Sequence, residues 1–342
     1  MKSMLAGLLC VVSVPVLYQE AELRFAPVAG QQVSVDYERV FYLKLEDTET
    51  TMAFDGEDQG PPESADMGYA MTETESIRYT DTFDIVGDEV VGIRRHFSRI
   101  GNLLVEEVTD PLGEEFIDEN KGQSELEGGT VVFTREGDAK GLEAEFDSAF
   151  DEASKGLDEE LLEGLEARAD LMDFLPDEAV APGARWEIPV SAFIRMTNLS
   201  GDLSVVQEGD DQDEPDDGYG EQFDEKLRGS FTAKFEEICE MDGERIAVIV
   251  LHAELETTVL TINDLDAEEA EGTEEDEHTF SFELDGFLHW NLGAGHAKEL
   301  ELSGEITLVM DSNKKYSFEG HELVIHEVQS YLGTLDFAAT ID

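Results

Sequence analysis

Val33-Ser-Val-Asp-Tyr-Glu-Arg-Val-Phe-Tyr-Leu-Lys-Leu45 is the stretch that decides the fold class. Apolar residues take every second position from Val33 to Leu45, interrupted only by Arg39, and most of the positions between them are polar. Successive side chains of a β-strand point to opposite faces, so a period of two predicts a long strand with one buried face.

The C-terminal third repeats this pattern twice. Residues 279–292 and 299–310 alternate apolar with polar or acidic side chains, and Gly293-Ala-Gly-His296 lies between them. This arrangement predicts a long hairpin with one apolar and one acidic face. Gly286 and Gly304 interrupt the apolar face. Because glycine inside a strand commonly marks a bulge or a sharp bend, we expect the sheet to curve.

Three further hairpins are expected around the turn signals at residues 241–244, 87–88 and 137–138. Residues 246–251 are apolar on both faces, which predicts a central strand. The whole chain is expected to contain about ten to fourteen strands.

One amphipathic helix is predicted over residues 157–172, where leucines recur at spacings of three and four and acids take the opposite face. Three acidic segments, 55–76, 208–225 and 264–277, are expected to be surface loops. The predicted fold is therefore mainly β (α+β). Long antiparallel hairpins form a strongly curved sheet or an incomplete barrel, and one amphipathic helix covers part of its apolar concavity.

Residues 1–20 resemble a signal peptide, with Lys2 followed by a short, mostly apolar run. We therefore expect an exported protein, periplasmic or extracellular, with no transmembrane segment after signal removal; an uncleaved anchor or a first buried strand are the alternatives. A lipid anchor at Cys10 is disfavoured because Leu9 precedes it where a small residue is needed. Without Cys10, Cys239 has no partner for an internal disulfide.

The expected domains are a β-rich half over residues 21–176, ending in the helix, and an antiparallel β half over residues 177–342. The best joint between them is residues 176–186. One continuous domain is the alternative.

The charge of the chain is strongly negative. Asp and Glu number 82 against 22 Lys and Arg, a formal net charge of -60. Such a surface repels nucleic acids and anionic lipids, so no nucleic-acid partner is expected. The charge is explained by adaptation to a saline exterior, or by a surface that weakly condenses divalent cations.

No catalytic or metal motif has the required spacing. In His321-Glu-Leu-Val-Ile-His326 the second histidine is one residue too far for a zinc helix, and the segment reads as a strand with the two histidines on opposite faces. Residues 211–218 lack the ligand pattern of a calcium loop. His289 and His296 flank a turn and could approach each other across the hairpin, but exposed polar positions explain them better. We therefore expect no catalytic residue, no cofactor and no metal ligand.

A resemblance rests on three motifs: Leu161-Leu-Glu-Gly-Leu165, Asp170-Leu-Met-Asp-Phe-Leu-Pro176 and Val180-Ala-Pro-Gly-Ala-Arg-Trp186. Two shorter pieces, Leu23-Arg-Phe-Ala-Pro-Val-Ala-Gly30 and Leu126-Glu-Gly128, also fit. In these the chain resembles an uncharacterised family of exported, β-rich proteins of planctomycete-type bacteria. That family has no assigned activity, so the resemblance implies no functional residues. Ordinary structural roles also explain the motifs: Pro176 ends a helix, and Trp186 anchors a strand.

Three functions are compatible with these features. The first is an exported non-enzymatic protein that binds an apolar small molecule in a curved sheet. The second is a structural or surface-interaction protein whose acidic loops condense cations. The third is a hydrolase, which would need a deep cleft with two isolated carboxylates or a nucleophile beside a histidine. The sequence does not indicate the oligomeric state.

Overall fold

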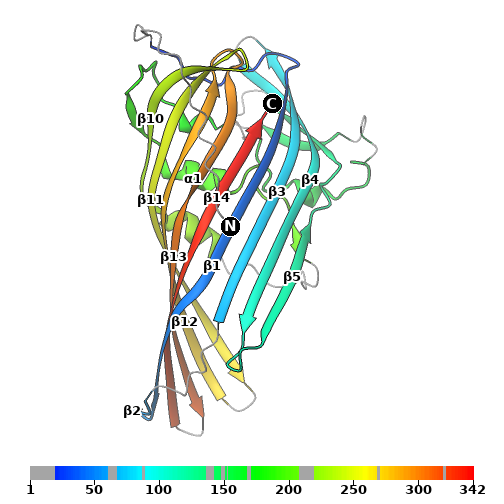
Figure 1. Ribbon diagram of the computed structural model, residues 1–342. Helices are drawn as coiled ribbons and strands as arrows, with labels where there is room; N and C mark the ends of the chain where they lie inside the picture. The colour runs from blue at the N-terminus through cyan, green and yellow to red at the C-terminus, as the bar shows by residue number, and fades with distance from the viewer. Residues whose placement is uncertain are drawn as a thin grey trace.

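The computed structural model describes residues 20–60, 68–86, 89–135, 142–147, 151, 153–167, 171–207, 219–267, 270–318 and 321–342. Their strands form one strongly curved, open antiparallel sheet, in the order β7-β6-β4-β3-β1-β14-β13-β12-β11-β10-β8 (Figure 1). The short strands β2, β5 and β9 pair beside this path. The prediction of a mainly β fold with a curved sheet is confirmed.

The strands differ widely in length, and the longest belong to β1 and the C-terminal third. Their bounds are β1 Gln32–Phe54, β2 Glu57–Asp58, β3 Gly68–Val86, β4 Glu89–Thr109, β5 Glu115–Gln123, β6 Thr130–Thr134, β7 Glu143–Phe146, β8 Arg185–Glu187, β9 Val206–Gln207, β10 Arg228–Met241, β11 Glu244–Ala267, β12 Ala270–Asn291, β13 His296–Phe318 and β14 His321–Ile341.

Residues 33–45, whose alternation predicts a long strand, lie in β1, near the centre of the sheet. Val33, Val35, Tyr37 and Leu43 are buried on the concave face, as the alternation predicts. β1 pairs with β3 on one side and with β14 on the other. The first and last long strands of the chain are therefore neighbours.

The predicted hairpins are present. β10 and β11 join at Asp242-Gly243, where both residues have positive φ, and β12 and β13 join across residues 292–295. β3 pairs with β4 up to Val86 and Glu89, and β6 pairs with β7. β11, which contains the apolar run 246–251, lies between β10 and β12.

A diagonal of three glycines bends the sheet. Gly286, Gly304 and Gly333 lie on neighbouring strands, on the concave face, each one row further along. A Cβ atom at these positions would lie 2.0 Å from Glu301 O, 2.0 Å from Glu283 O and 1.7 Å from Tyr42 O, respectively. The backbones can approach this closely only because glycine has no side chain. We call this diagonal the glycine crease.

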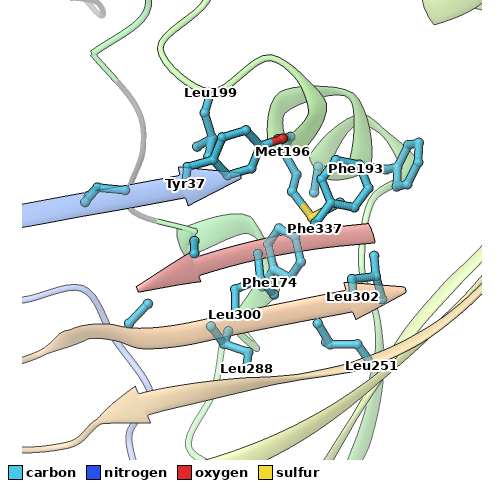
Figure 2. Packing of buried hydrophobic residues seen from close by; sticks show 14 of the residues in the cluster. Tyr37, Phe174, Phe193, Met196, Leu199, Leu251, Leu288, Leu300, Leu302 and Phe337 are labelled. Carbon is cyan, nitrogen blue, oxygen red and sulfur yellow. The ribbon is translucent and has the colours of Figure 1, made fainter. Parts of the chain in front are cut away.

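Irregular chain and two short helices cover part of the concave face, and Phe193 and Phe223 of the helices reach Phe282, beyond Gly286. The helices are α1 (Val190–Thr197) and α2 (Tyr219–Lys226). Two 3-10 turns, η1 (Glu159–Leu162) and η2 (Met172–Phe174), precede them in the sequence. α1 is amphipathic and buries Phe193 and Met196. Figure 2 shows these side chains packed against Tyr37 and Phe337 of the sheet. A helix thus covers part of the concavity, as expected, but from residues 190–197.

The helix predicted over residues 157–172 is wrong in position. Of this stretch, residues 168–170 lie outside the described part, and the remainder contains only the turn η1 and the start of η2. Gly164 has a φ of 77°, and Leu165 forms an isolated bridge with Gly201. Arg95 donates to the carbonyl oxygens of Glu166 and Ala167, so these acceptors serve a tertiary contact instead of a helix.

Two of the expected acidic loops are largely strand. Residues 68–76 belong to β3, and residues 264–267 and 270–277 belong to β11 and β12. Lysines from β13 stand opposite this acidic end of β12, and Lys314 forms an ion pair with Glu274. Such cross-strand charge pairs favour pairing over a free loop. Residues 208–218 and the signal-like residues 1–19 lie outside the described part.

The proposed joint is tied to the sheet. Trp186 lies in β8 and donates to Phe174 O at 2.9 Å, and Ala21 bridges to Val180. Strands from both predicted halves share the sheet, with β1 paired to β14. Neither α1 nor α2 has the length and apolar character that crossing a membrane requires.

Candidate functional site

The covered part of the concavity is occupied by the chain itself. Phe174, Phe193, Met196 and Leu199 of the covering segments are buried against the sheet (Figure 2). One cavity between the covering segments and β1, β3, β4, β13 and β14 measures about 20 Å³. That volume holds about one water molecule, so this cavity has no room for an organic ligand.

Five strands continue well past β3. The pairing of β1 with β3 ends at Lys44 and Ala70, whereas β1 and β14 stay paired to Phe54 and Leu323. We define the distal sheet as residues 47–54, 259–267, 270–278, 310–318 and 321–329. Figure 1 shows these strand ends tapering away from the rest of the molecule.

The concave face of the distal sheet carries a groove of about 340 Å³, which lies within the range of small-molecule sites. Its lining forms a grid of three rows across β12, β13 and β14. By strand register the rows are Glu274, Lys314 and Ile325; then Asp276, Ser312 and Glu327; then His278, Met310 and Gln329. Directly paired residues of antiparallel strands share a face, so all nine side chains belong to one surface.

A chain of hydrogen bonds orders one wall of the groove. Glu327 accepts a hydrogen bond of 2.6 Å from Gln329, and its other oxygen lies 3.4 Å from the Thr50 hydroxyl. Tyr331 donates to Gln329 at 2.6 Å. Tyr69 packs edge-on against Tyr331 and donates to Glu106. These contacts hold Glu327 and Gln329 in place from β1 and β14.

The groove is negatively charged. Glu274, Asp276 and Glu327 face a single cationic side chain, Lys314, so three carboxylates against one ammonium leave two negative charges. The hydrogen bond with Glu274 raises the pKa of Lys314, which stays protonated. Burial lowers the pKa of His278, while Asp276 opposes this effect. His278 is therefore neutral at neutral pH and does not offset the charge.

The groove combines polar groups with apolar surface. Met310 and Ile325 supply apolar contact area beside the carboxylates. Ser312 Oγ is buried and has no hydrogen-bond partner among the residues that the structure describes. A buried hydroxyl without a partner costs free energy, which a ligand atom would recover. This arrangement suits the binding of a small molecule with both polar and apolar parts.

The four candidate histidines of the sequence, His289, His296, His321 and His326, do not form a site. His321 and His326 lie on β14 with odd and even positions on opposite faces, and each pairs with its own aspartate, Asp55 and Asp311. His289 binds Glu299, whereas His296 binds Ala297 O, so the two do not meet. Within the described ranges, no group of three or more potential ligands is placed to hold a metal ion.

Cys239 lies half-buried in β10, not fully in the core. Residues 211–218, which lack the ligand pattern of a calcium loop, lie outside the described part.

Sequence reasoning missed the groove because it assigned residues 264–277 to a loop. A signal was present: Glu274, Asp276 and His278 alternate with a period of two, as do Met310, Ser312 and Lys314. When both faces of a strand carry polar side chains, hydrophobic periodicity does not reveal the strand. Only the register of β12 against β13 brings the two triplets together.

Comparisons with known proteins give little similarity. No family model matches the chain, and no curated protein matches it. Among solved structures, an outer membrane channel from Pseudomonas putida F1 shares 8% identity over 93% of this chain and 98% of its own, with a TM-score of 0.16. Pseudomonas aeruginosa OccK7 (OpdD) shares 5% identity over 91% and 99%, with a TM-score of 0.17. Similarity at this level implies nothing about function.

Proposed function

We propose that this chain is an exported, non-enzymatic binding protein that holds one small amphipathic molecule in the distal groove. The observation that carries the proposal is the groove itself, about 340 Å³ in size, with Met310 and Ile325 beside Asp276, Ser312 and Glu327 on one face of the sheet. The signal-like residues 1–20 support export.

The ligand chemistry differs from the purely apolar molecule suggested by a curved sheet. A purely apolar ligand in this groove would remove water from carboxylates without replacing their hydrogen bonds, which is costly. An amphipathic ligand covers Met310 and Ile325 and keeps polar atoms near the acids. The groove therefore favours a molecule with a polar head and a short apolar body.

A fluorescent dye can test the site. N-phenyl-1-naphthylamine is neutral and mostly apolar, with one N–H donor, so the net charge of the protein does not repel it and it reports contact with the apolar part of the groove. We expect it to bind the wild-type protein and to lose most of its affinity in Ser312→Phe, which fills the middle of the groove. Ser312 Oγ has no hydrogen-bond partner in the described part of the chain, so this change breaks no hydrogen bond there.

The matched control is Ser303→Phe. Ser303 lies on the same strand, β13, but is exposed on the convex face. The dye should bind this variant like the wild type. Equal binding by both variants, or no binding by the wild type, would contradict the proposal.

A second candidate, cation condensation, is favoured by one feature of the convex face. Glu254, Glu283 and Glu305 stand directly opposite one another on β11, β12 and β13 and line a hollow of about 580 Å³. Like charges directly opposite on a sheet are destabilising, and cations relieve that repulsion.

Melting curves test this second candidate. At low salt, Glu283→Gln should raise the melting temperature by about 1 °C and should reduce the stabilisation that calcium gives the wild type. Glu301→Gln is the control, because Glu301 faces Phe287 and Ala338. A calcium response that is the same in all three proteins would argue against condensation at this row.

A further inference from the structure

The middle row of the distal groove has a chemistry of its own. Across five strands it reads Thr261, Asp276, Ser312, Glu327 and Thr50. Two carboxylates thus flank a serine hydroxyl, and threonine hydroxyls stand at both ends. Every member of this row offers an oxygen atom that can accept a hydrogen bond.

The protein compensates the charges of this row only in part. Lys314 forms its ion pair with Glu274, in the adjacent row. Glu327 is contacted by the neutral donors Thr50 and Gln329. Asp276 forms no hydrogen bond or ion pair with any residue in the described ranges. Neither carboxylate is therefore in direct contact with a cation in the described ranges, and the Lys314 ammonium, which also interacts electrostatically with Asp276, is bound to Glu274.

The spacing of the two carboxylates fits an extended ligand. Asp276 and Glu327 are two strands apart, which corresponds to about 10 Å at the usual strand spacing. Within the described ranges, neither carboxylate belongs to a group of three or more potential ligands placed to hold a metal ion. A molecule with two positive charges at its ends can reach both.

The groove between the two carboxylates suits an aliphatic linker. Met310 lies one row away from Ser312 on one side, and the Lys314 and Ile325 pair lies on the other. The stem of Lys314, Met310 and Ile325 offer apolar contact to methylene groups.

We propose that the ligand of the distal groove is a linear aliphatic diammonium compound, with one ammonium group at Asp276 and the other at Glu327. This inference rests on the proposed binding function and names the class of its ligand. A chain of about five methylenes fits within the distance between the two carboxylates.

Isothermal titration calorimetry with 1,5-diaminopentane and pentylamine tests the inference at constant ionic strength. The two probes have the same carbon chain and differ in one ammonium group. The diamine should bind the wild type at least about tenfold more tightly, because the second ammonium forms a charge-assisted hydrogen bond. Asp276→Asn and Glu327→Gln should each weaken diamine binding by about tenfold.

The matched control is Glu277→Gln. It removes the same charge from β12 at the next position, on the opposite face of the strand. Nonspecific attraction to a chain of net charge -60 would weaken equally in Glu277→Gln and Asp276→Asn. That result would overturn the inference, whereas unchanged diamine binding by Glu277→Gln supports it.

The naphthylamine dye distinguishes a wrong ligand class from a wrong binding function. If the dye binds the groove but the diamine binds no tighter than pentylamine, the ligand class is wrong and the binding function stands. If neither the dye nor the diamine binds, both are wrong. Melting curves of Asp276→Asn and Glu327→Gln should match the wild type within about 2 °C, since both substitutions preserve shape.

Discussion

At the scale of single residues, Arg95 organises the interface between the sheet and its covering segments. Its side chain is fully buried, makes two hydrogen bonds of 2.8 Å to Asp81 and lies over the Tyr79 ring. It also donates to Glu166 O, Ala167 O and Ser200 Oγ. One guanidinium therefore joins two strands to two covering segments, which its five fixed donors make possible.

Replacing Arg95 with methionine should destabilise the protein by about 3–5 kcal/mol, because Asp81 would be left as a buried charge without its partner. Urea denaturation measures this loss. The control is Arg24→Met, since Arg24 is 67% exposed and its ion pair with Glu22 should contribute less than about 1 kcal/mol. Similar effects of the two substitutions would show that Arg95 does not organise the interface.

His252 on the convex face should titrate with a raised pKa. Its hydrogen bond to Asp285 at 2.9 Å is the main cause, and Glu254 adds to it. Because the folded-state pKa exceeds the unfolded value of about 6.5, the pair stabilises the protein below that pH. The contribution is lost as the pH rises through the folded-state pKa. An NMR titration should show a lower pKa for His252 in Asp285→Asn than in the wild type. The pKa of His252 should not change in the control Asp336→Asn, because Asp336 lies on the same face of the sheet but two strands away from Asp285.

At the scale of elements, the glycine crease crosses β12, β13 and β14 before the distal sheet begins. Gly286 and Gly304 are visible in the sequence because they interrupt an apolar alternation, and the predicted curvature is confirmed. Gly333 likewise interrupts an alternation that includes Tyr331, Leu335 and Phe337, but the sequence does not indicate what it contacts. Its role depends on the register of β14 against β1, which places it against Tyr42 O.

Gly333→Ala should destabilise the protein by about 3 kcal/mol, because the added Cβ would lie 1.7 Å from Tyr42 O and the strands would have to separate. Gly101→Ala is the control: Gly101 also lies in a long strand, β4, and a Cβ there meets nothing within 4 Å. That change should be neutral or stabilise slightly. Equal stability of the two variants would mean that the crease can open at no cost.

At the scale of the whole molecule, the two predicted halves share one sheet. β1 pairs with β14 from Val35 and Ile341 to Phe54 and Leu323. The covering segments reach across both halves, as the contacts of Phe193 with Phe282 and of Tyr37 with Met196 O show. This arrangement favours a single folding unit over two independent domains.

Residues 177–342 should therefore fail to fold alone, because cutting the chain exposes the full edge of β14 and part of the apolar face. Co-expression with residues 21–176 should restore a soluble complex. The full chain should unfold in one transition, with far-UV circular dichroism and tryptophan fluorescence coinciding. A cooperative melting transition of residues 177–342 in isolation would instead establish two domains.

The sequence by itself determined the fold class, because alternation along a strand is a local property that residues 33–45, 279–292 and 299–310 display without reference to any partner. It determined most hairpins for the same reason, through turns such as Asp242-Gly243. It misplaced the helix of residues 157–172, whose leucine spacing is helical but whose carbonyl groups bind Arg95.

Only the tertiary structure decided where a ligand could bind. The groove depends on register, since Asp276, Ser312 and Glu327 become neighbours when three strands pair in one alignment. A shift by one residue would place these side chains on opposite faces. The physical reason is that local patterns fix which face a side chain occupies, whereas strand pairing over long separations fixes which side chains meet.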